Sequence, residues 1–272
     1  FKHLYLISKV MKNVKFVKVN LSKKINLNKL GLKYSYIFNL AAILGVEKVS
    51  NFPFEVLDKN IIINKNLINL CKLQNVPCKF ILFSTSEVYS GILKNYDINI
   101  PTKEIQSLPL SDISIPRTSY ALSKIYCEAM CFHSGINFTI LRPHNIYGPR
   151  MGLIHVIPEL LNRSFLLKKN GVLKINNPTH IRAFCYIDDA VKIILKIIKS
   201  KSSNKEIYNI GNGLESISIK KLSQIIIKTT NRADIKMRYY SKLNYSPKKR
   251  IPNMKKTLKL LKNFKFTSLN EG

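Results

Sequence analysis

Short apolar runs and helically spaced apolar positions alternate along the first half of the chain. Val14–Val19 alternates apolar and polar residues, and Tyr34–Ala42 is an apolar run that ends in small residues, so both predict strands. Lys79–Phe83 and Phe138–Leu141 are runs typical of strands buried on both faces of a parallel sheet. Residues 60–73 space their apolar side chains as a helix does. This alternation predicts an α/β protein with a Rossmann-like, doubly wound parallel sheet.

The pattern becomes less regular after residue 150. Helices are predicted over Val156–Leu167, Ala190–Lys199 and Ile219–Thr229, and a strand is predicted over Arg182–Ile187. We therefore expect a sheet domain over residues 1–150 and a smaller C-terminal lobe over residues 151–272. The stretch Arg182–Asp189 is expected to return toward the sheet.

Polar and small residues follow three of the predicted strands directly. They are Ala41-Ala42, Ser84–Glu87 and Arg142–Asn145. In doubly wound sheets, ligands bind beyond the carboxyl ends of the strands. The three segments therefore predict one ligand site at this edge.

The formal net charge of +30 raises the question of a nucleic-acid partner. The lysines are spread over the whole chain and occur with many Ile and Asn residues, without an arginine-rich block. A coding bias toward A+T explains this composition better, so we expect no nucleic-acid partner. No apolar run reaches the roughly 18–20 residues of a membrane span, and no membrane partner is expected.

Five cysteines occur, an odd number without a Cys-x-x-Cys motif. Reduced thiols in a cytoplasmic protein are the simplest interpretation. No cluster of His and Cys residues predicts a metal site. The chain begins at Phe1 with neither an initiator Met nor a signal peptide, and we therefore expect a fragment of a longer protein.

The candidate chemistry begins with Tyr120 and Lys124, four residues apart in a stretch that lacks Gly and Pro. Positions i and i+4 share one helical face, so the phenol and the ammonium can project together. A free Tyr titrates near pH ~10, and a neighbouring cation favours its ionised form. The pair could thus act as a general base and its activating cation, or it could be an ordinary surface pair.

Further motifs stand around this pair in a defined order, and together they cover most of the chain. They are Asn39-Leu40-Ala41-Ala42, Ser84-Thr85-Ser86-Glu87-Val88-Tyr89, Tyr120-x-x-x-Lys124, Leu141-Arg142-Pro143-His144-Asn145-Ile146-Tyr147-Gly148-Pro149-Arg150, Arg182–Asp189 and Tyr208-Asn209-Ile210-Gly211. With these motifs the chain resembles the extended short-chain dehydrogenase/reductase family, which contains the NAD-dependent nucleotide-sugar epimerases, dehydratases and decarboxylases.

The resemblance implies oxidation of a nucleotide sugar, usually at C4, with transient storage of the hydride on NAD. Tyr120 would be the base, and Lys124 would bind the nicotinamide ribose and lower the pKa of the phenol. Thr85 would hydrogen-bond the reacting sugar oxygen, unless it is only a strand-end hydroxyl that satisfies the backbone. The segment Leu40-Ala41-Ala42 and Asn20 would lie against the cofactor.

The subfamilies differ after the oxidation step. Dehydratases carry an Asp-Glu pair after the Thr, whereas UDP-glucuronate decarboxylases carry Thr-Ser-Glu, as Thr85-Ser86-Glu87 does here. This favours a decarboxylase-like or a 4-epimerase reaction. Many relatives of undefined substrate share the motif, and Glu87 could instead be a solvated or capping carboxylate.

The resemblance also places substrate-binding residues in and before the C-terminal lobe. Asn145 would meet the nucleotide diphosphate or the sugar, and Arg182 would contact the diphosphate with its planar guanidinium. Arg250, in an Arg-x-Pro sequence like that of the decarboxylases, would be a second anion contact. Each arginine could also be an ordinary surface residue in a chain with 45 Lys and Arg.

The sequence departs from the family pattern in two respects. No Gly-x-x-Gly-x-x-Gly turn occurs, although this turn meets the NAD pyrophosphate at a helix N-terminus in the family. Val14–Val19 resembles the third strand of the family, so we expect the preceding elements to be missing and NAD binding by this chain to be weak. Asn20 and Asn39 also replace the usual Asp and His.

Three functional hypotheses follow. The leading one is an NAD-dependent nucleotide-sugar enzyme, which would be a homodimer if it associates as its relatives commonly do through the helix that bears Tyr120. The face formed by Ile125, Cys127, Met130 and Cys131 fits such an interface and an ordinary core equally well. The second hypothesis is a catalytically impaired remnant that acts as a binding or structural protein. The third is a basic nucleic-acid-binding protein.

Overall fold

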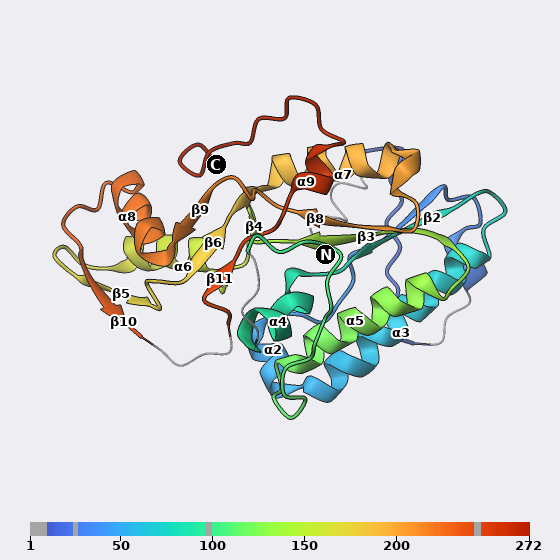
Figure 1. Cartoon of the computed structure of the whole chain (residues 1–272), viewed down its shortest axis with the longest axis horizontal. Helices are drawn as coiled ribbons and strands as arrows, with labels where there is room; N and C mark the ends of the chain where they lie inside the picture. The colour runs from blue at the N-terminus through green and yellow to red at the C-terminus, as the bar shows by residue number, and fades with distance from the viewer. Residues whose placement is uncertain (1–9, 24–26, 96–99, 242–245) are drawn as a thin grey trace.

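The computed structural model describes residues 10–23, 27–95, 100–241 and 246–272. Four parallel strands form the central sheet in the order β1-β2-β3-β8. They are β1 (Tyr36–Asn39), β2 (Lys79–Phe83), β3 (Asn137–Pro143) and β8 (Glu206–Ile210). The fold class predicted from the sequence is confirmed, because helices cover both faces of this sheet (Figure 1).

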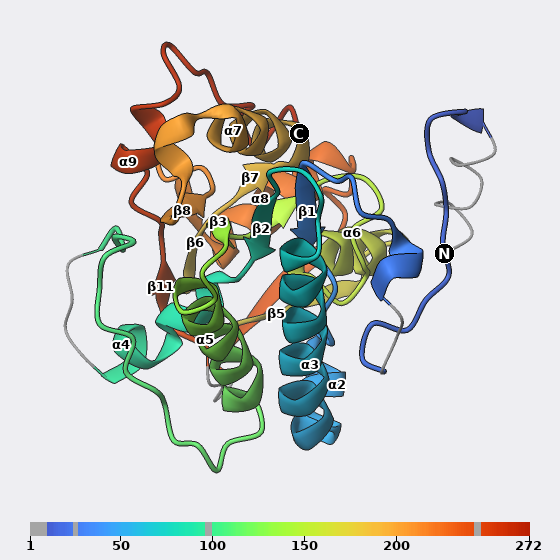
Figure 2. The same cartoon turned by 90° about the vertical axis from the view of Figure 1, so that its right-hand side faces the viewer.

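The helices α3 (Pro53–Lys72) and α5 (Thr118–Phe132) lie side by side on one face of the sheet, and α7 (Ile187–Lys199) lies on the other (Figures 1 and 2). The first core contains buried residues from both α3 and α5, among them Leu67 and Cys131. This face of α5 is thus an ordinary core, as the sequence allowed. The second core joins α7 to the strands through residues such as Ile193.

The strand predicted over Val14–Val19 is wrong. Residues 13–20 have no assigned helix or strand, and Figure 2 shows the segment (dark blue) running outside the layered body. An alternating strand is stable only when a neighbour pairs its backbone and covers its apolar face. Here Val17 remains 46% exposed. The first strand of the described sheet is therefore β1, which lies at its edge.

The remaining strand predictions are confirmed, Lys79–Phe83 with the predicted bounds and the others with shifted bounds. The strand expected over Arg182–Ile187 is divided into β6 (Ile181–Ala183) and β7 (Cys185–Tyr186), and α7 begins at Ile187. β6 pairs with β9 (Ser216–Ser218) and β11 (Lys249–Arg250), and β7 pairs with β4 (Ile146–Tyr147). These short pairings connect the central sheet to the C-terminal lobe.

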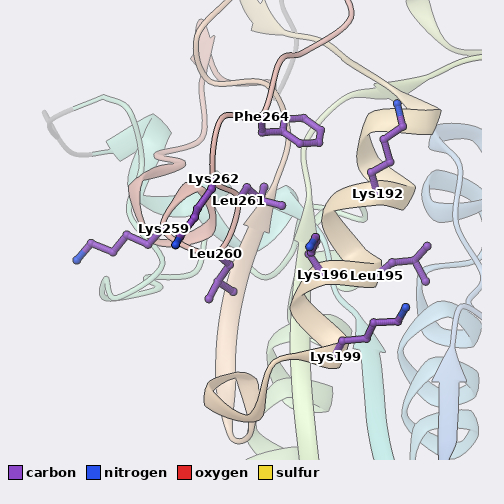
Figure 3. Close-up of a pocket in the computed structure, with 9 residues that line it drawn as sticks. All are labelled: Lys192, Leu195, Lys196, Lys199, Lys259, Leu260, Leu261, Lys262 and Phe264. Atoms are coloured by element: carbon purple, nitrogen blue, oxygen red, sulfur yellow. The ribbon is translucent and has the colours of Figure 1, made fainter.

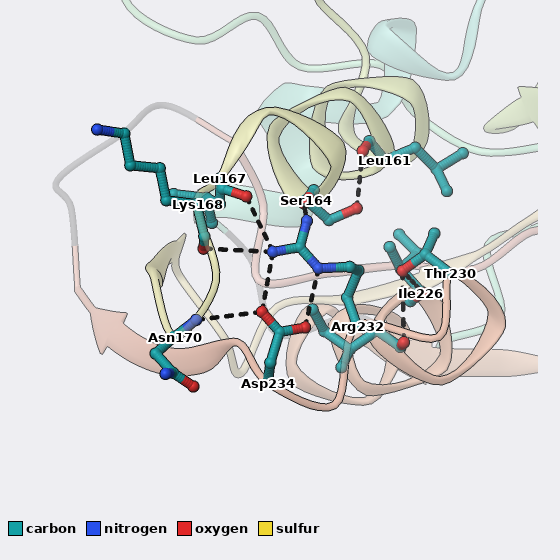
Figure 4. Close-up of polar contacts among 10 residues, drawn as sticks. Leu161, Ser164, Leu167, Lys168, Asn170, Ile226, Thr230, Arg232 and Asp234 are labelled. Atoms are coloured by element: carbon teal, nitrogen blue, oxygen red, sulfur yellow. Dashed lines mark hydrogen bonds and ion pairs between the residues drawn. The ribbon is translucent and has the colours of Figure 1, made fainter.

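The C-terminal lobe contains the parallel pair β5 (Val172–Asn176) and β10 (Lys236–Tyr240), with the helices α6 (Val156–Leu166) and α8 (Ile219–Thr229). Figure 4 shows how Arg232 holds the lobe together. Its guanidinium donates to the carbonyl oxygens of Ser164 at 2.6 Å and Leu167 at 2.9 Å, and it pairs with Asp234. One side chain thus ties the end of α6 to the loop before β10.

Short helices complete the chain. They are the 3₁₀ turns η1 (Leu27–Leu30), η2 (Ser86–Tyr89) and η3 (Lys201–Ser203) and the helices α2 (Val46–Asn51), α4 (Ser90–Asn95) and α9 (Lys255–Leu258). No helix among the described residues is both long and apolar enough to cross a membrane.

Candidate active site

Thr85 lies where the chain leaves the carboxyl end of β2. Its hydroxyl caps η2 by accepting a hydrogen bond from the backbone N–H of Glu87 at 3.2 Å. The same hydroxyl lies near enough to the phenol of Tyr120 to lower the pKa of that phenol. Thr85 can satisfy the backbone at the strand end and also hydrogen-bond a sugar oxygen, because a hydroxyl can donate one hydrogen bond while it accepts others.

Tyr120 occupies the first turn of α5 and is only partly exposed. The pKa of its phenol is raised to about 12: burial has the largest effect and raises it, Thr85 lowers it, and the carboxylate of Glu87 raises it. A phenol in this state is a poor base at neutral pH. Catalysis would therefore require a further positive charge near its oxygen.

Lys124 is 4% exposed, and burial lowers the pKa of its ammonium. Its Nζ donates to the backbone carbonyl of Phe83 at 2.8 Å, at the end of β2. This bond fixes α5 against the end of β2. An ammonium has three donors, so capacity remains for a ligand hydroxyl.

The segment Leu40–Ala42 follows β1 directly, and the residue after it, Ile43, is hydrogen-bonded to α3. The amide of Asn60 on α3 accepts from the N–H of Ile43 at 2.7 Å and donates to the hydroxyl of Ser123 on α5 at 3.1 Å. The loop after β1 is thereby linked to the helix turn between Tyr120 and Lys124. This arrangement matches the place expected for a cofactor-contacting segment.

The two asparagines that replace the usual family residues have different surroundings. Asn39 is buried at the end of β1, and its amide nitrogen donates to Asn64 at 2.9 Å. Asn20 is exposed, and its side chain accepts two hydrogen bonds from Ser22. Among the described residues, no hydrogen bond joins Asn20 to Tyr120 or Lys124, so its place at the cofactor stays a prediction.

Glu87 is neither a solvated nor a capping carboxylate. Its Oε1 accepts from Arg250 at 2.9 Å and from Arg117 at 3.2 Å. Burial raises the pKa of Glu87, but the two guanidinium groups outweigh it and hold that pKa at about 2. Glu87 is therefore ionised at neutral pH. Its neighbour Ser86 is buried in η2.

Arg182 and Arg250 lie directly opposite each other on the paired strands β6 and β11. Arg182 donates to the carbonyl of Ile181 at 2.8 Å and to the hydroxyl of Ser246 at 2.8 Å. Burial, and after it the positive charge of Arg250, lower the pKa of Arg182 to about 10. Two like charges in cross-strand register are unfavourable, so this site favours an anion.

Asn145 is placed at the turn between β3 and β4. Its backbone adopts a left-handed conformation with φ of 41°, which asparagine tolerates better than most residues. Its side-chain amide donates to the carbonyl of Ala183 at 3.1 Å. Asn145 thus connects the end of β3 to β6, the strand that carries Arg182.

A buried network that was not predicted from the sequence supports α5. Arg142 on β3 is 2% exposed and donates to both carboxylate oxygens of Glu128, at 2.9 Å from Nε and 2.6 Å from Nη2. Ser84 donates to the same carboxylate. Glu128 stands four residues after Lys124, as Lys124 stands four residues after Tyr120. The sequence therefore indicated that all three side chains share one face of the helix.

Arg117 was also missed. It precedes α5 directly, and no acidic residue stands in the first turn of the helix. A cation at the positive end of a helix is unfavourable. That placement is a sequence signal for a role other than helix stabilisation, and the contact with Glu87 bears this out.

A separate cavity of about 690 Å³ lies between α7 and residues 259–264 (Figure 3). It belongs to the face of the sheet that α7 covers, and none of its lining residues is a predicted site residue. They are Lys192, Leu195, Lys196, Lys199, Lys259, Leu260, Leu261, Lys262 and Phe264. Within the described ranges, no group of three His, Cys, Asp or Glu side chains could hold a metal ion.

The parallel sheet and a Tyr–Lys pair beside the strand ends define a Rossmann-type α/β protein of the short-chain dehydrogenase kind. Residues 3–211 match the family described as "NAD dependent epimerase/dehydratase family". The chain belongs to this family.

Several relatives are similar over most of the chain. UDP-D-apiose/UDP-D-xylose synthase 1 of Arabidopsis thaliana is 26% identical over 78% of this chain and 61% of its own length. UDP-N-acetyl-alpha-D-glucosaminuronate decarboxylase of Bacillus cytotoxicus is 30% identical over 80% of this chain and 66% of its own. The chain thus spans somewhat less than two thirds of these relatives.

Solved structures show the same fold. The UDP-glucuronic acid 4-epimerase of Bacillus cereus, solved with UDP-glucuronic acid and NAD, is 25% identical and superposes with a TM-score of 0.75. The match covers 91% of this chain and 76% of that one. An epimerase of Methanothermobacter thermautotrophicus superposes with a TM-score of 0.78 at 19% identity.

The residues present fit one end of NAD. Lys124 offers buried donor capacity beside Tyr120, and the fixed loop Leu40–Ala42 lies at the end of the neighbouring strand. The 272 residues contain no Gly-x-x-Gly-x-x-Gly turn to hold the pyrophosphate. The fit is therefore to the ribose and nicotinamide end of the cofactor.

Proposed function

We propose that the protein oxidises a nucleotide sugar at C4 and then decarboxylates or epimerises it. One arrangement carries the proposal: Thr85, directly after β2, lowers the pKa of Tyr120, and Lys124 on the same helix as Tyr120 donates to the end of β2. Arg250, which lies opposite Arg182 on the paired strands β6 and β11, is joined to the turn after Thr85 through Glu87. Bound NAD would supply the hydride acceptor and would be regenerated at the end of the cycle.

The residues would have the following roles. The hydroxyl of Thr85 would hold the sugar oxygen at C4 within reach of Tyr120, and the phenolate of Tyr120 would accept the proton of that oxygen. Lys124 would bind a ribose hydroxyl while it keeps α5 against β2. Asn145, Arg182 and Arg250 would bind the substrate.

The state of Glu87 supports a decarboxylase or an epimerase over a dehydratase. A dehydratase needs an acid that can protonate the departing hydroxyl. The pKa of Glu87, held at about 2 by Arg250 and Arg117, makes it unsuited to that task at neutral pH. A β-keto acid loses CO₂ readily once C4 is a carbonyl, so a decarboxylase needs no such acid. Ser86 would support this turn from its buried position.

The alternative is a catalytically impaired member of the family that binds a nucleotide sugar without converting it. The amides at Asn20 and Asn39 and the raised pKa of Tyr120 favour it. The Thr85–Tyr120–Lys124 arrangement opposes it.

Product analysis tests the proposal. The protein expressed from its complete coding sequence is incubated with NAD and with UDP-glucuronate, UDP-N-acetylglucosamine or dTDP-glucose, and the products are identified by mass spectrometry. We expect conversion of at least one sugar, with CO₂ release from UDP-glucuronate if decarboxylation occurs. Binding without conversion would support the impaired alternative.

Two further expectations belong to the same proposal. A homodimer would use the exposed side of α5, where Tyr126 is 52% exposed, and sedimentation would detect its mass.

A reducing compartment such as the cytoplasm is supported by the free thiols of all five cysteines.

A further inference from the structure

We infer that the cavity between α7 and residues 259–264 binds a small anionic amphiphile, a free molecule with one apolar chain and a carboxylate or phosphate group at its end. The cavity lies on the face of the sheet that α7 covers, whereas α5 with Tyr120 covers the other face. The inference therefore goes beyond the proposed function and does not depend on it.

The cavity has the size of a small-ligand site. Its volume of about 690 Å³ lies within the roughly 300–1,000 Å³ that sites for small molecules occupy. A second copy of the chain is a poor occupant, because two chains with a net charge of +30 would repel each other across a lysine-rich surface. The occupant that fits best is a small molecule.

Apolar side chains from both walls line the cavity. Leu195 on α7 is 46% exposed. Leu260, Leu261 and Phe264 line the cavity from the facing segment. The ring of Phe264 packs edge-on against Phe266, with 4.9 Å between the ring centroids, so its position is set by the protein. An apolar chain in the cavity would remove this surface from water, which is favourable.

Both ends of the facing segment are anchored to the sheet domain. Before the segment, the hydroxyl of Thr257 donates to the carbonyl of Asn209 on β8 at 2.8 Å. After it, the backbone N–H of Thr267 donates to the carboxylate of Asp189 on α7 at 2.6 Å. The wall of the cavity is thus held in place by the protein itself, and a preformed site loses less entropy on binding.

Five lysines line the cavity, and none of the described residues that line it is acidic. Lys192, Lys196 and Lys199 share one face of α7 at spacings of four and three residues (Figure 3). Lys259 and Lys262 stand on the facing segment. Among the described residues, the only ion pair of these five ammonium groups joins Lys192 to Asp189 at 3.8 Å. This excess of positive charge favours an anionic ligand.

The usual reasons for surface lysines explain only part of this arrangement. The helix dipole favours cations in the last turn of α7, where Lys196 and Lys199 lie. Lys192 is near the middle of α7, and Lys262 lies in a turn outside any helix. A solvated lysine face also needs no apolar residue, yet Leu195 stands three residues after Lys192 and four before Lys199. A chain with an anionic end would match both features.

An NMR titration of the protein expressed from its complete coding sequence tests the inference. The probes are octanoate, octan-1-ol and octylammonium, which have the same number of carbon atoms and differ in charge. We expect octanoate to shift the amide signals of α7 and residues 259–264. It should bind at least about tenfold more tightly than octanol, because several partly exposed ion pairs together give about that factor. Octylammonium should bind more weakly than octanol.

Two variants separate the charge from the apolar lining. Lys196→Gln combined with Lys262→Gln should weaken octanoate binding about fivefold and leave octanol binding almost unchanged. Leu195→Ser should weaken the binding of both probes. The control is Lys65→Gln combined with Lys72→Gln, which removes two exposed charges from α3 on the other face of the sheet. Circular dichroism verifies that each variant keeps the fold.

Several outcomes would overturn the inference. They are equal binding of octanoate and octanol, failure of octanoate to bind at millimolar concentration, and amide shifts confined to other parts of the protein. An equal loss of octanoate binding in the α3 control would show that net charge alone attracts the anion. Co-sedimentation with phosphatidylglycerol vesicles without octanoate binding would assign the surface to a lipid bilayer instead. None of these results bears on the proposed function, which product analysis tests separately.

Discussion

Two guanidinium groups determine the ionisation of Glu87. Its pKa is about 2 in the folded protein, against an ordinary value of 4.5. Because the folded pKa lies below the unfolded one, the stabilisation is fully present above about pH 4.5 and is lost as the pH falls through about 2. The difference between the unfolded and the folded pKa of Glu87 corresponds to about 3 kcal/mol of unfolding free energy.

We predict that Glu87→Gln flattens the pH dependence of stability in this acid range. Chemical unfolding between pH 5 and 2 should show the unmodified protein losing about 3 kcal/mol more than the variant. Glu159→Gln on α6, which removes an exposed i,i+4 pair with Arg163, should keep the original slope within about 1 kcal/mol. If the unfolding free energy of the unmodified protein, Glu87→Gln and Glu159→Gln changed equally with pH, the pairing of Glu87 would be contradicted.

The candidate side chains Tyr120 and Lys124 could be selected from the sequence, but the groups that they contact could not. The spacing of Tyr120 and Lys124 predicts a shared helical face, which follows from local geometry alone. The bond from Lys124 to the carbonyl of Phe83 depends on how α5 packs against β2, which no local pattern specifies. For the same reason, the role of Arg117 at Glu87 was not predicted.

At the scale of elements, a buried ion pair holds α5 in place. Arg142 of β3 and Glu128 of α5 make two short hydrogen bonds, and both side chains are almost fully buried. Burial lowers the pKa of Arg142, but Glu128 outweighs this effect and raises it above its ordinary value. This pair therefore sets the position of the helix that carries Tyr120 and Lys124.

We predict that Glu128→Gln destabilises the protein by about 3–5 kcal/mol, because it leaves the buried guanidinium without a counter-charge. Urea unfolding measures the effect. Arg163→Gln, which breaks an exposed pair on α6, should cost less than about 1 kcal/mol. The double variant Glu128→Leu, Arg142→Met should be more stable than Glu128→Gln. Equal destabilisation by the exposed and the buried variants would contradict this account.

The elements were predictable where local pattern and packing agree. Lys79–Phe83 and Ile219–Thr229 have the predicted bounds. Val14–Val19 was wrong because alternation alone does not supply a neighbouring strand. β8 was not predicted because its five residues include the polar Glu206 and Asn209. Asn209 is nevertheless buried, where its side chain accepts a hydrogen bond from Tyr89 and donates one to the carbonyl of Thr102.

At the scale of the whole molecule, the two ends of the proposed cofactor site differ. Tyr120, Lys124 and the loop after β1 are the residues that we propose to hold the ribose and nicotinamide end. The sequence holds no Gly-rich turn for the pyrophosphate. Backbone amides at such a turn contribute much of the binding of a dinucleotide phosphate.

We therefore predict that the 272-residue chain does not form a stoichiometric complex with NAD at micromolar concentrations. Titration calorimetry measures this, and a protein in which a Gly-rich strand–turn–helix unit precedes these residues is the comparison. Tight binding by the 272-residue chain would contradict the prediction and would require another phosphate site.

The central claim is that Tyr120 is the base that starts oxidation of a nucleotide sugar. The most direct measurement is turnover of the converted sugar by Tyr120→Phe in the protein expressed from its complete coding sequence. We predict a loss of at least about 100-fold, because the variant keeps the ring and removes only the proton acceptor. Tyr126→Phe, on the exposed side of the same helix, should retain full turnover. Equal turnover by Tyr120→Phe and the unmodified protein would contradict the account.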